Sequence, residues 1–140
     1  MKKILLFTAF VGLLCFACKK SETPEQVVKN YYECYFNYDF EKIQEYVTPE
    51  KREYYKKIQE VINQNATDLE SPKVEITNIQ CKYNEDSSVA ICNCDIIRED
   101  NNNKEVEKSG LTLKRVDDKW LVDMGKETSL DIANLLEEEK

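Results

Sequence analysis

The sequence predicts an α+β fold in which three N-terminal helices pack on a curved four-stranded antiparallel sheet, a cone fold. Two patterns carry this prediction. Between residues 23 and 65 the apolar side chains recur at helical spacing, as they do on the buried face of a helix. Between residues 73 and 124 they alternate with polar ones, as in strands that bury one face. The length, 140 residues, suits a single domain.

The start of the chain has the pattern of an export signal. Lys2 and Lys3 precede an apolar run over residues 4–17, which is too short to span a bilayer. Cys18 follows directly, and the arrangement resembles the lipobox of bacterial lipoproteins, whose cysteine carries lipid after cleavage. The alternative is an ordinary cleaved signal peptide with an incidental cysteine. We expect a lipoprotein signal peptide over 1–17, lipidation at Cys18, and attachment to the bacterial cell envelope at the outer membrane, on its periplasmic side or at the surface.

The rest of the chain divides into three parts. Residues 18–22 are a lipid-anchored tether, residues 23–126 form the domain, and residues 127–140 are a tail with a short helix.

The composition argues against several classes of function. The chain has no histidine, so it lacks the commonest general base and the commonest metal ligand. Without Lys2 and Lys3 of the leader, residues 18–140 carry 18 basic and 27 acidic residues, a net charge of −9. Such a charge repels nucleic acid and anionic headgroups, so the predicted membrane contact is the lipid anchor. No cofactor is predicted.

Start signals place the three predicted helices. Thr23-Pro24-Glu25-Gln26 combines a capping threonine with a proline in the first turn and a glutamine that completes a capping box, and this helix runs to about Tyr38. Asp39 caps a short second helix. Thr48-Pro49-Glu50 starts the third, which ends near Asn65. The inward-facing residues are Val27, Val28, Tyr31, Cys34, Tyr35 and Tyr38, then Phe40, Ile43 and Val47, then Tyr54, Ile58, Val61 and Ile62.

Four strands are predicted as a meander over residues 74–83, 89–97, 106–116 and 119–124. In the first hairpin, pairing Tyr83 with Ser88 or with Ala90 puts the cysteines of both strands on one face. Pairing Tyr83 with Val89 does not. With either Ser88 or Ala90 as the partner, Cys81, Cys92 and Cys94 lie on the core side.

Several short motifs, taken in their order, resemble a known superfamily. They are Thr23 to Val28, Tyr38 to Lys42, Tyr46 to Glu50, Ser88-Val89-Ala90 and Asp118-Lys119-Trp120. The chain resembles the nuclear transport factor two-like superfamily of cystatin-like cone domains, and within it small bacterial lipoproteins of unknown function. This resemblance implies a concave pocket between sheet and helices. The superfamily includes isomerases, dehydratases and epoxide hydrolases as well as non-catalytic binding domains, so the fold alone assigns no activity.

Two groups of residues are candidates for such a pocket. Tyr31, Tyr35 and Tyr54 could stack on a flat ligand, although aromatic residues at helical spacing are also ordinary core residues. Asn93 and Asp95 share the face of the second strand that also holds Ile91 and Ile97. If that face lines the pocket, Asp95 is a weak candidate for a catalytic base. Otherwise it is a solvent-facing residue.

Besides Cys15 in the leader and Cys18, the chain has four cysteines, Cys34, Cys81, Cys92 and Cys94. We consider three interpretations of these four. One is a disulfide between Cys81 and Cys92, which pairing of Tyr83 with Ser88 or with Ala90 would allow. Cys34 is a rival partner, most plausibly for Cys94. A zinc site formed by all four is the third reading, but bridges or core packing are commoner in an exported domain, so no metal site is predicted.

The leading functional hypothesis is a lipid-anchored, non-catalytic binding module for a small ligand or an envelope protein. The alternative is a pocket enzyme of the isomerase or hydrolase type that uses an Asp/Tyr pair. A third hypothesis is a purely structural partner subunit that pairs through its open sheet face, against which a monomeric solution mass would count. The oligomeric state is expected to be a monomer or a dimer formed through the sheet.

Overall fold

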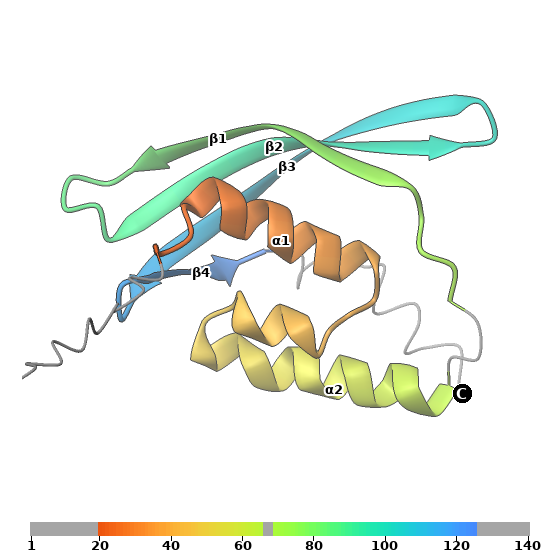
Figure 1. Ribbon diagram of the computed structural model, residues 1–140, viewed down its shortest axis with the longest axis horizontal. Coiled ribbons are helices and arrows are strands. Elements are labelled where there is room, and N and C mark those ends of the chain that lie inside the picture. Colours follow the sequence, from red (N-terminus) through yellow and green to blue (C-terminus); the bar gives the residue numbers. More distant parts are fainter. Residues whose placement is uncertain (1–19, 66–68, 126–140) are drawn as a thin grey trace, which may run out of the picture.

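The computed structural model describes residues 20–65 and 69–125, which form two α-helices, a 3-10 turn and one antiparallel sheet (Figure 1). In chain order the elements are α1 (Pro24–Phe36), η1 (Lys42–Glu45), α2 (Pro49–Asn65), β1 (Val74–Tyr83), β2 (Val89–Asp100), β3 (Asn103–Val116) and β4 (Lys119–Met124). The predicted leader, Cys18 and the predicted tail helix lie outside the described residues. No helix in the described part of the chain is long and apolar enough to cross a membrane.

The prediction of three N-terminal helices is wrong, because the second is only the short turn η1. The predicted cap is also wrong, because the N-cap of η1 is Glu41, which makes no side-chain cap hydrogen bond. Asp39 lies earlier in the turn, where its Oδ1 accepts a hydrogen bond from the Lys42 backbone amide at 3.0 Å. The chain then turns extended and joins β4. The Val122 amide donates to the Tyr46 carbonyl at 2.7 Å, and the Thr48 amide donates to the Val122 carbonyl at 2.9 Å. This pairing with β4 and the following Pro49 prevent a longer helix.

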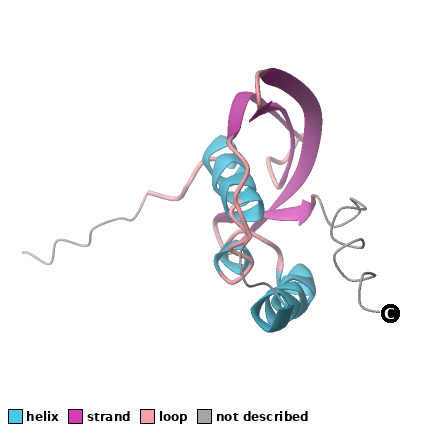
Figure 2. Ribbon diagram, turned by 90° about the vertical axis from the view of Figure 1, so that its right-hand side faces the viewer, coloured by secondary structure: helices cyan, strands magenta, loops and turns pink. Residues whose placement is uncertain are grey.

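The layering also differs from the predicted cone. Figures 1 and 2 show α1 against one face of the sheet, with η1 and α2 on the far side of α1. The prediction packed all the helices on the sheet, whereas α1 makes most of the contacts between the helices and the strands and α2 packs against η1. The protein therefore has fewer helices than predicted, and only α1 covers the sheet extensively.

Because α1 lies between two layers, it is buried on most of its circumference. Its buried residues are Pro24, Val27, Val28, Tyr31, Tyr32, Cys34, Tyr35 and Phe36. A helix with a single apolar stripe packs on one neighbour, whereas a helix that is apolar on most sides is enclosed. The start of α1 is fixed by the predicted capping box, in which Thr23 and Gln26 exchange hydrogen bonds.

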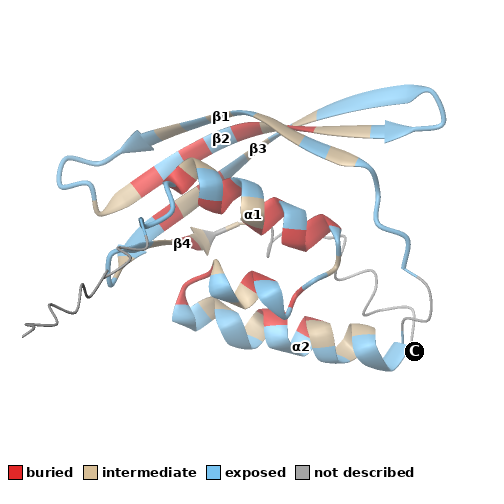
Figure 3. Ribbon diagram, in the orientation of Figure 1, coloured by how far each residue is buried: buried red, intermediate tan, exposed pale blue. Residues whose placement is uncertain are grey.

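The sheet is a meander in the order β1-β2-β3-β4. In the first hairpin Tyr83 pairs with Ala90, which is one of the two registers that place the cysteines together. Ala90, Cys92, Cys94 and Ile96 are accordingly buried toward α1. The β2–β3 hairpin turns through Asn101 and Asn102, both at positive φ, which asparagine tolerates better than most residues. Figure 3 shows that this end of the sheet, beyond α1, is mostly exposed.

The contact between α1 and α2 gives a first prediction. Tyr55 is fully buried, and its hydroxyl lies 2.7 Å from that of Tyr31, whereas the adjacent Tyr54 is only partly buried. Tyr55→Ala should therefore lower the free energy of unfolding by about 3 to 5 kcal/mol, as truncation of a large buried aromatic residue does. Urea denaturation followed by circular dichroism measures the loss.

The matched control is Tyr54→Ala, on the same turn of α2, which should cost clearly less. Equal losses in the two variants would contradict the assignment of Tyr55 as the residue that joins the helices.

Candidate functional site

The predicted tyrosine pocket is a packed interior. Tyr31 is fully buried and Tyr35 is 7% exposed, and their rings lie 6.4 Å apart, centroid to centroid. The ring of Tyr31 also meets that of Tyr55 edge to face at 6.3 Å. Tyr54 packs against the same cluster from its surface. The structure thus places these tyrosines in and around the core, and sequence patterning missed Tyr32 and Tyr55, which are fully buried as well.

Asn93 and Asp95 lie on the opposite face of the sheet. They alternate along β2 with the buried Cys92, Cys94 and Ile96, so their side chains point away from α1. Asn93 is exposed and Asp95 is partly exposed. Because the tyrosines lie on the helix side, the structure does not bring Asp95 together with a tyrosine hydroxyl.

This outer face of the sheet holds an open depression with a volume of about 710 Å³. Strands β1, β2 and β3 form it together. Its lining residues are Asn78, Gln80, Asn93, Cys94, Asp95, Lys108, Ser109 and Gly110. We call it the outer-face depression. It contains two residues named from the sequence, Asn93 and Asp95, and three polar neighbours that became evident only from strand pairing: Asn78, Gln80 and Lys108.

A β-bulge shapes one wall of the outer-face depression. The pairing of β1 with β2 shifts between Thr77 and Gln80, so an extra residue is accommodated in β1. At this bulge Asn78 has a φ of 51°, in the left-handed region that most residues avoid. Its amide donates to Asp95 Oδ2 at 2.7 Å. The bulge thus turns the amide of Asn78 toward the carboxylate of the neighbouring strand.

The absence of a side chain at Gly110 keeps the bottom of the outer-face depression open. Gly110 pairs with Asn93, and a methyl group placed on Gly110 would lie 3.1 Å from Asn93 Oδ1. Glycine weakens the interior of a strand, and in such a position it often marks a close approach of another group. The side chain of the neighbouring Ser109 points toward the helices, where its Oγ accepts a hydrogen bond from the Tyr32 hydroxyl at 2.7 Å. Gly110 therefore leaves the backbone of β3 open to solvent.

A smaller cleft of about 120 Å³ lies between α1 and η1 and includes Cys34. Burial raises the pKa of the Cys34 thiol to about 11, and the nearby Asp39 carboxylate acts in the same direction. A thiol with this pKa is protonated at neutral pH and is a poor nucleophile or metal ligand.

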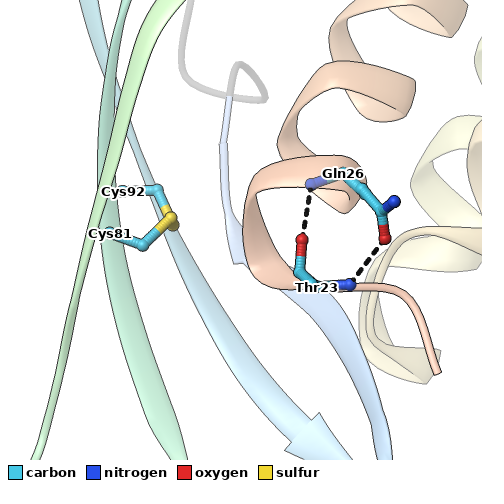
Figure 4. The surroundings of a disulfide bond; sticks show 4 residues. All are labelled: Thr23, Gln26, Cys81 and Cys92. Carbon is cyan, nitrogen blue, oxygen red and sulfur yellow. Dashed lines mark hydrogen bonds between the residues drawn. A yellow bond between two sulfur atoms is a disulfide. The ribbon is translucent and has the colours of Figure 1, made fainter. Parts of the chain in front are cut away.

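The cysteines form one bridge, between Cys81 and Cys92, which are directly opposite in the hairpin. Figure 4 shows the sulfur atoms on the side of the sheet that faces the start of α1. Cys34 and Cys94, the rival pair, are buried and form no disulfide. In the described part of the chain no group of cysteine, aspartate and glutamate side chains is arranged to hold a metal ion.

Comparisons with known proteins add little. No protein-family model and no curated protein sequence matches the chain. The chain is similar to the solution structure of a SEC-C motif containing protein from Rhodopseudomonas palustris, with 16% identity, a TM-score of 0.48 and coverage of 74% of this chain and 77% of that one. A likeness at this level carries no argument about function. The resemblance to the nuclear transport factor two-like lipoproteins stays a prediction.

The bridge gives a second prediction. Alkylation of the denatured, unreduced domain should label Cys34 and Cys94, and peptide mass spectrometry should find Cys81 linked to Cys92. Reduction should lower the free energy of unfolding by about 3 kcal/mol, because the bridge closes a short loop in the unfolded chain. Labelling of all four cysteines before reduction would contradict the bridge.

The buried thiol gives a third prediction, on pH. The folded chain holds the Cys34 proton up to a pKa of about 11, whereas the unfolded chain releases it near 9. Because the folded state holds this proton more tightly, protonated Cys34 contributes fully to the free energy of unfolding below pH 9. That contribution is lost as the pH rises toward 11. Denaturation curves from pH 7 to 11 should show the stability difference between wild type and Cys34→Ala narrowing. A difference that stays constant over this range would contradict the shifted pKa.

Proposed function

We propose that this chain is a non-catalytic binding module, held at the bacterial cell envelope by lipid on Cys18, which binds a small ligand in the outer-face depression. The observation that carries the binding part of the proposal is the depression itself. Its volume, about 710 Å³, falls within the range of ordinary ligand sites. The helix side of the sheet offers no comparable space around Tyr31 and Tyr35, because aromatic rings fill it.

The geometry favours binding over catalysis. The Asp/Tyr enzyme hypothesis requires Asp95 and a tyrosine hydroxyl on the same reacting group. Asp95 instead accepts a hydrogen bond from Asn78 on the outer face, while the Tyr31 hydroxyl lies inside against that of Tyr55. General acid–base catalysis requires a group within hydrogen-bond reach of the proton it transfers, and the sheet separates these two. Neither can therefore assist the other.

The proposed anchor is compatible with the start of the domain. The capping box fixes the chain at Thr23, and α1 begins at the next residue. The five residues from 18 to 22 could span at most about 17 Å when fully extended. The proposal therefore implies a domain held close to the membrane surface.

The anchor gives a fourth prediction. Cys18→Ala should abolish incorporation of a fatty-acid analogue and release the protein from the membrane fraction, because attachment rests on covalent lipid. The domain should keep its melting temperature, since the fold starts at the capping box. Continued incorporation of the analogue in Cys18→Ala would contradict lipidation at this residue.

The binding part is tested by native mass spectrometry of the domain purified from its own cells under mild conditions. A co-purified small molecule that is lost on denaturation supports the proposal.

Pairing of two copies through the sheet is a second candidate, favoured by one observation. Ile91 and Val106 are 56% and 54% exposed, and strand alternation and pairing place both on the outer face. Exposed apolar residues on an uncovered face suit a protein contact. A dimeric solution mass that becomes monomeric in Ile91→Lys would support this candidate over ligand binding, whereas a monomeric wild type would exclude it.

A further inference from the structure

We infer that the ligand of the outer-face depression is an uncharged saccharide. This inference rests on the proposed function and adds a ligand class to it. It is supported by three backbone irregularities that occur at the same place and by the chemistry of the side chains around them.

Three departures from regular strand structure meet at this one place. The bulge in β1 lies between Thr77 and Gln80, Asn78 within it is left-handed, and Gly110 interrupts the interior of β3. Each weakens a sheet or strains its backbone, and such features persist most often where function requires them. All three border the same depression, although they come from two strands that are not neighbours in the sheet.

The side chains around the depression offer both hydrogen-bond donors and hydrogen-bond acceptors. The side chains of Gln80 and Asn93 make no hydrogen bond with other described residues, and each side-chain amide supplies two N–H donors and a carbonyl acceptor. Asp95 uses Oδ2 to hold Asn78, which leaves Oδ1 as an acceptor. A sugar hydroxyl is both donor and acceptor, and neighbouring hydroxyls on a ring match the paired atoms of an amide or a carboxylate.

The charges favour a neutral ligand. Asp95 and Lys108 face each other across β2 and β3, so the depression holds one acid and one base. An anion such as phosphate would meet the carboxylate, and a cation would meet the ammonium group. A neutral polyhydroxylated ligand avoids both conflicts and can bond to both groups.

Gly110 explains how a ring could approach. Without a side chain at this position, the backbone of β3 at Gly110 is open, so a sugar ring could lie against β3 while its hydroxyls reach Asn93 and Lys108. A larger side chain at this position would fill the floor of the depression.

The test is a titration of the mature protein, without lipid, followed by amide chemical shifts in NMR. The probes are maltohexaose, cellohexaose, chitohexaose and xylohexaose, with inorganic phosphate as the charged comparison. At least one oligosaccharide should shift the amides around Asn93, Asp95 and Gly110 in a saturable way, and phosphate should not. Asn93→Ala should weaken that binding by about tenfold, the loss expected when one amide with two hydrogen bonds is removed.

Two further variants sharpen the result. Gly110→Val should remove binding, and if that variant fails to fold, Gln80→Ala at an exposed position replaces it. Val106→Thr changes an exposed residue of β3 outside the depression and should leave the affinity unchanged.

The remaining outcomes separate the two proposals. If no oligosaccharide moves these amides but a co-purified molecule of another class does, the saccharide inference is overturned and the binding module stands. Shifts confined to other parts of the protein overturn the site. If neither oligosaccharides nor co-purified molecules bind, both proposals are overturned, and protection of these amides by a dimer contact would then support pairing through the sheet.

Discussion

The enclosure of α1 between two layers is the constraint on which the rest of the structure depends. Its residues face the sheet through side chains such as Tyr32, which bonds to Ser109, and face α2 through Tyr31, which meets Tyr55. A helix buried on both sides needs apolar side chains around most of its surface, and α1 has them. The same enclosure fills the interior with aromatic rings, and the outer-face depression lies on the other face of the sheet.

The segment that follows η1 pairs with the edge strand β4, and this pairing limits the length of the helical segment before it. Residues 46–48 run beside β4 and exchange two backbone hydrogen bonds with Val122. These bonds cover part of the free edge of β4, and an uncovered edge invites pairing with other chains. Thr48 is buried at this junction, and its hydroxyl lies 3.5 Å from the Asp123 carboxylate. The predicted second helix is therefore replaced by an extended stretch that joins the helical layer to the sheet.

The outer face of the sheet combines backbone strain at Asn78 with exposure to solvent. The left-handed Asn78 is held by its bond to Asp95, and Gly110 lies across the same depression. From Gln80 to Tyr83, by contrast, β1 pairs regularly with β2, and the Cys81–Cys92 bridge links the two strands there. The bridge holds β1 and β2 together a short distance from the bulge, which limits how far the irregular region disturbs the register.

Local patterns in the sequence determined much of this protein. The capping box at Thr23 and Gln26 and the limits of β4 follow from short-range chemistry, in which a cap or a turn fixes its neighbours. The two-residue period of the strands left Ser88 and Ala90 as partners for Tyr83, and the structure pairs it with Ala90. Only the tertiary structure decided which residues each face of a helix or strand contacts. Helical spacing could not show that α1 is covered on two sides, that Tyr55 and not Tyr54 is the buried residue, or that the chain after Asp39 pairs with β4. Nor could alternation along β2 show which residues of β1 and β3 lie beside Asp95. These outcomes depend on contacts between residues far apart in the chain, which a local pattern does not record.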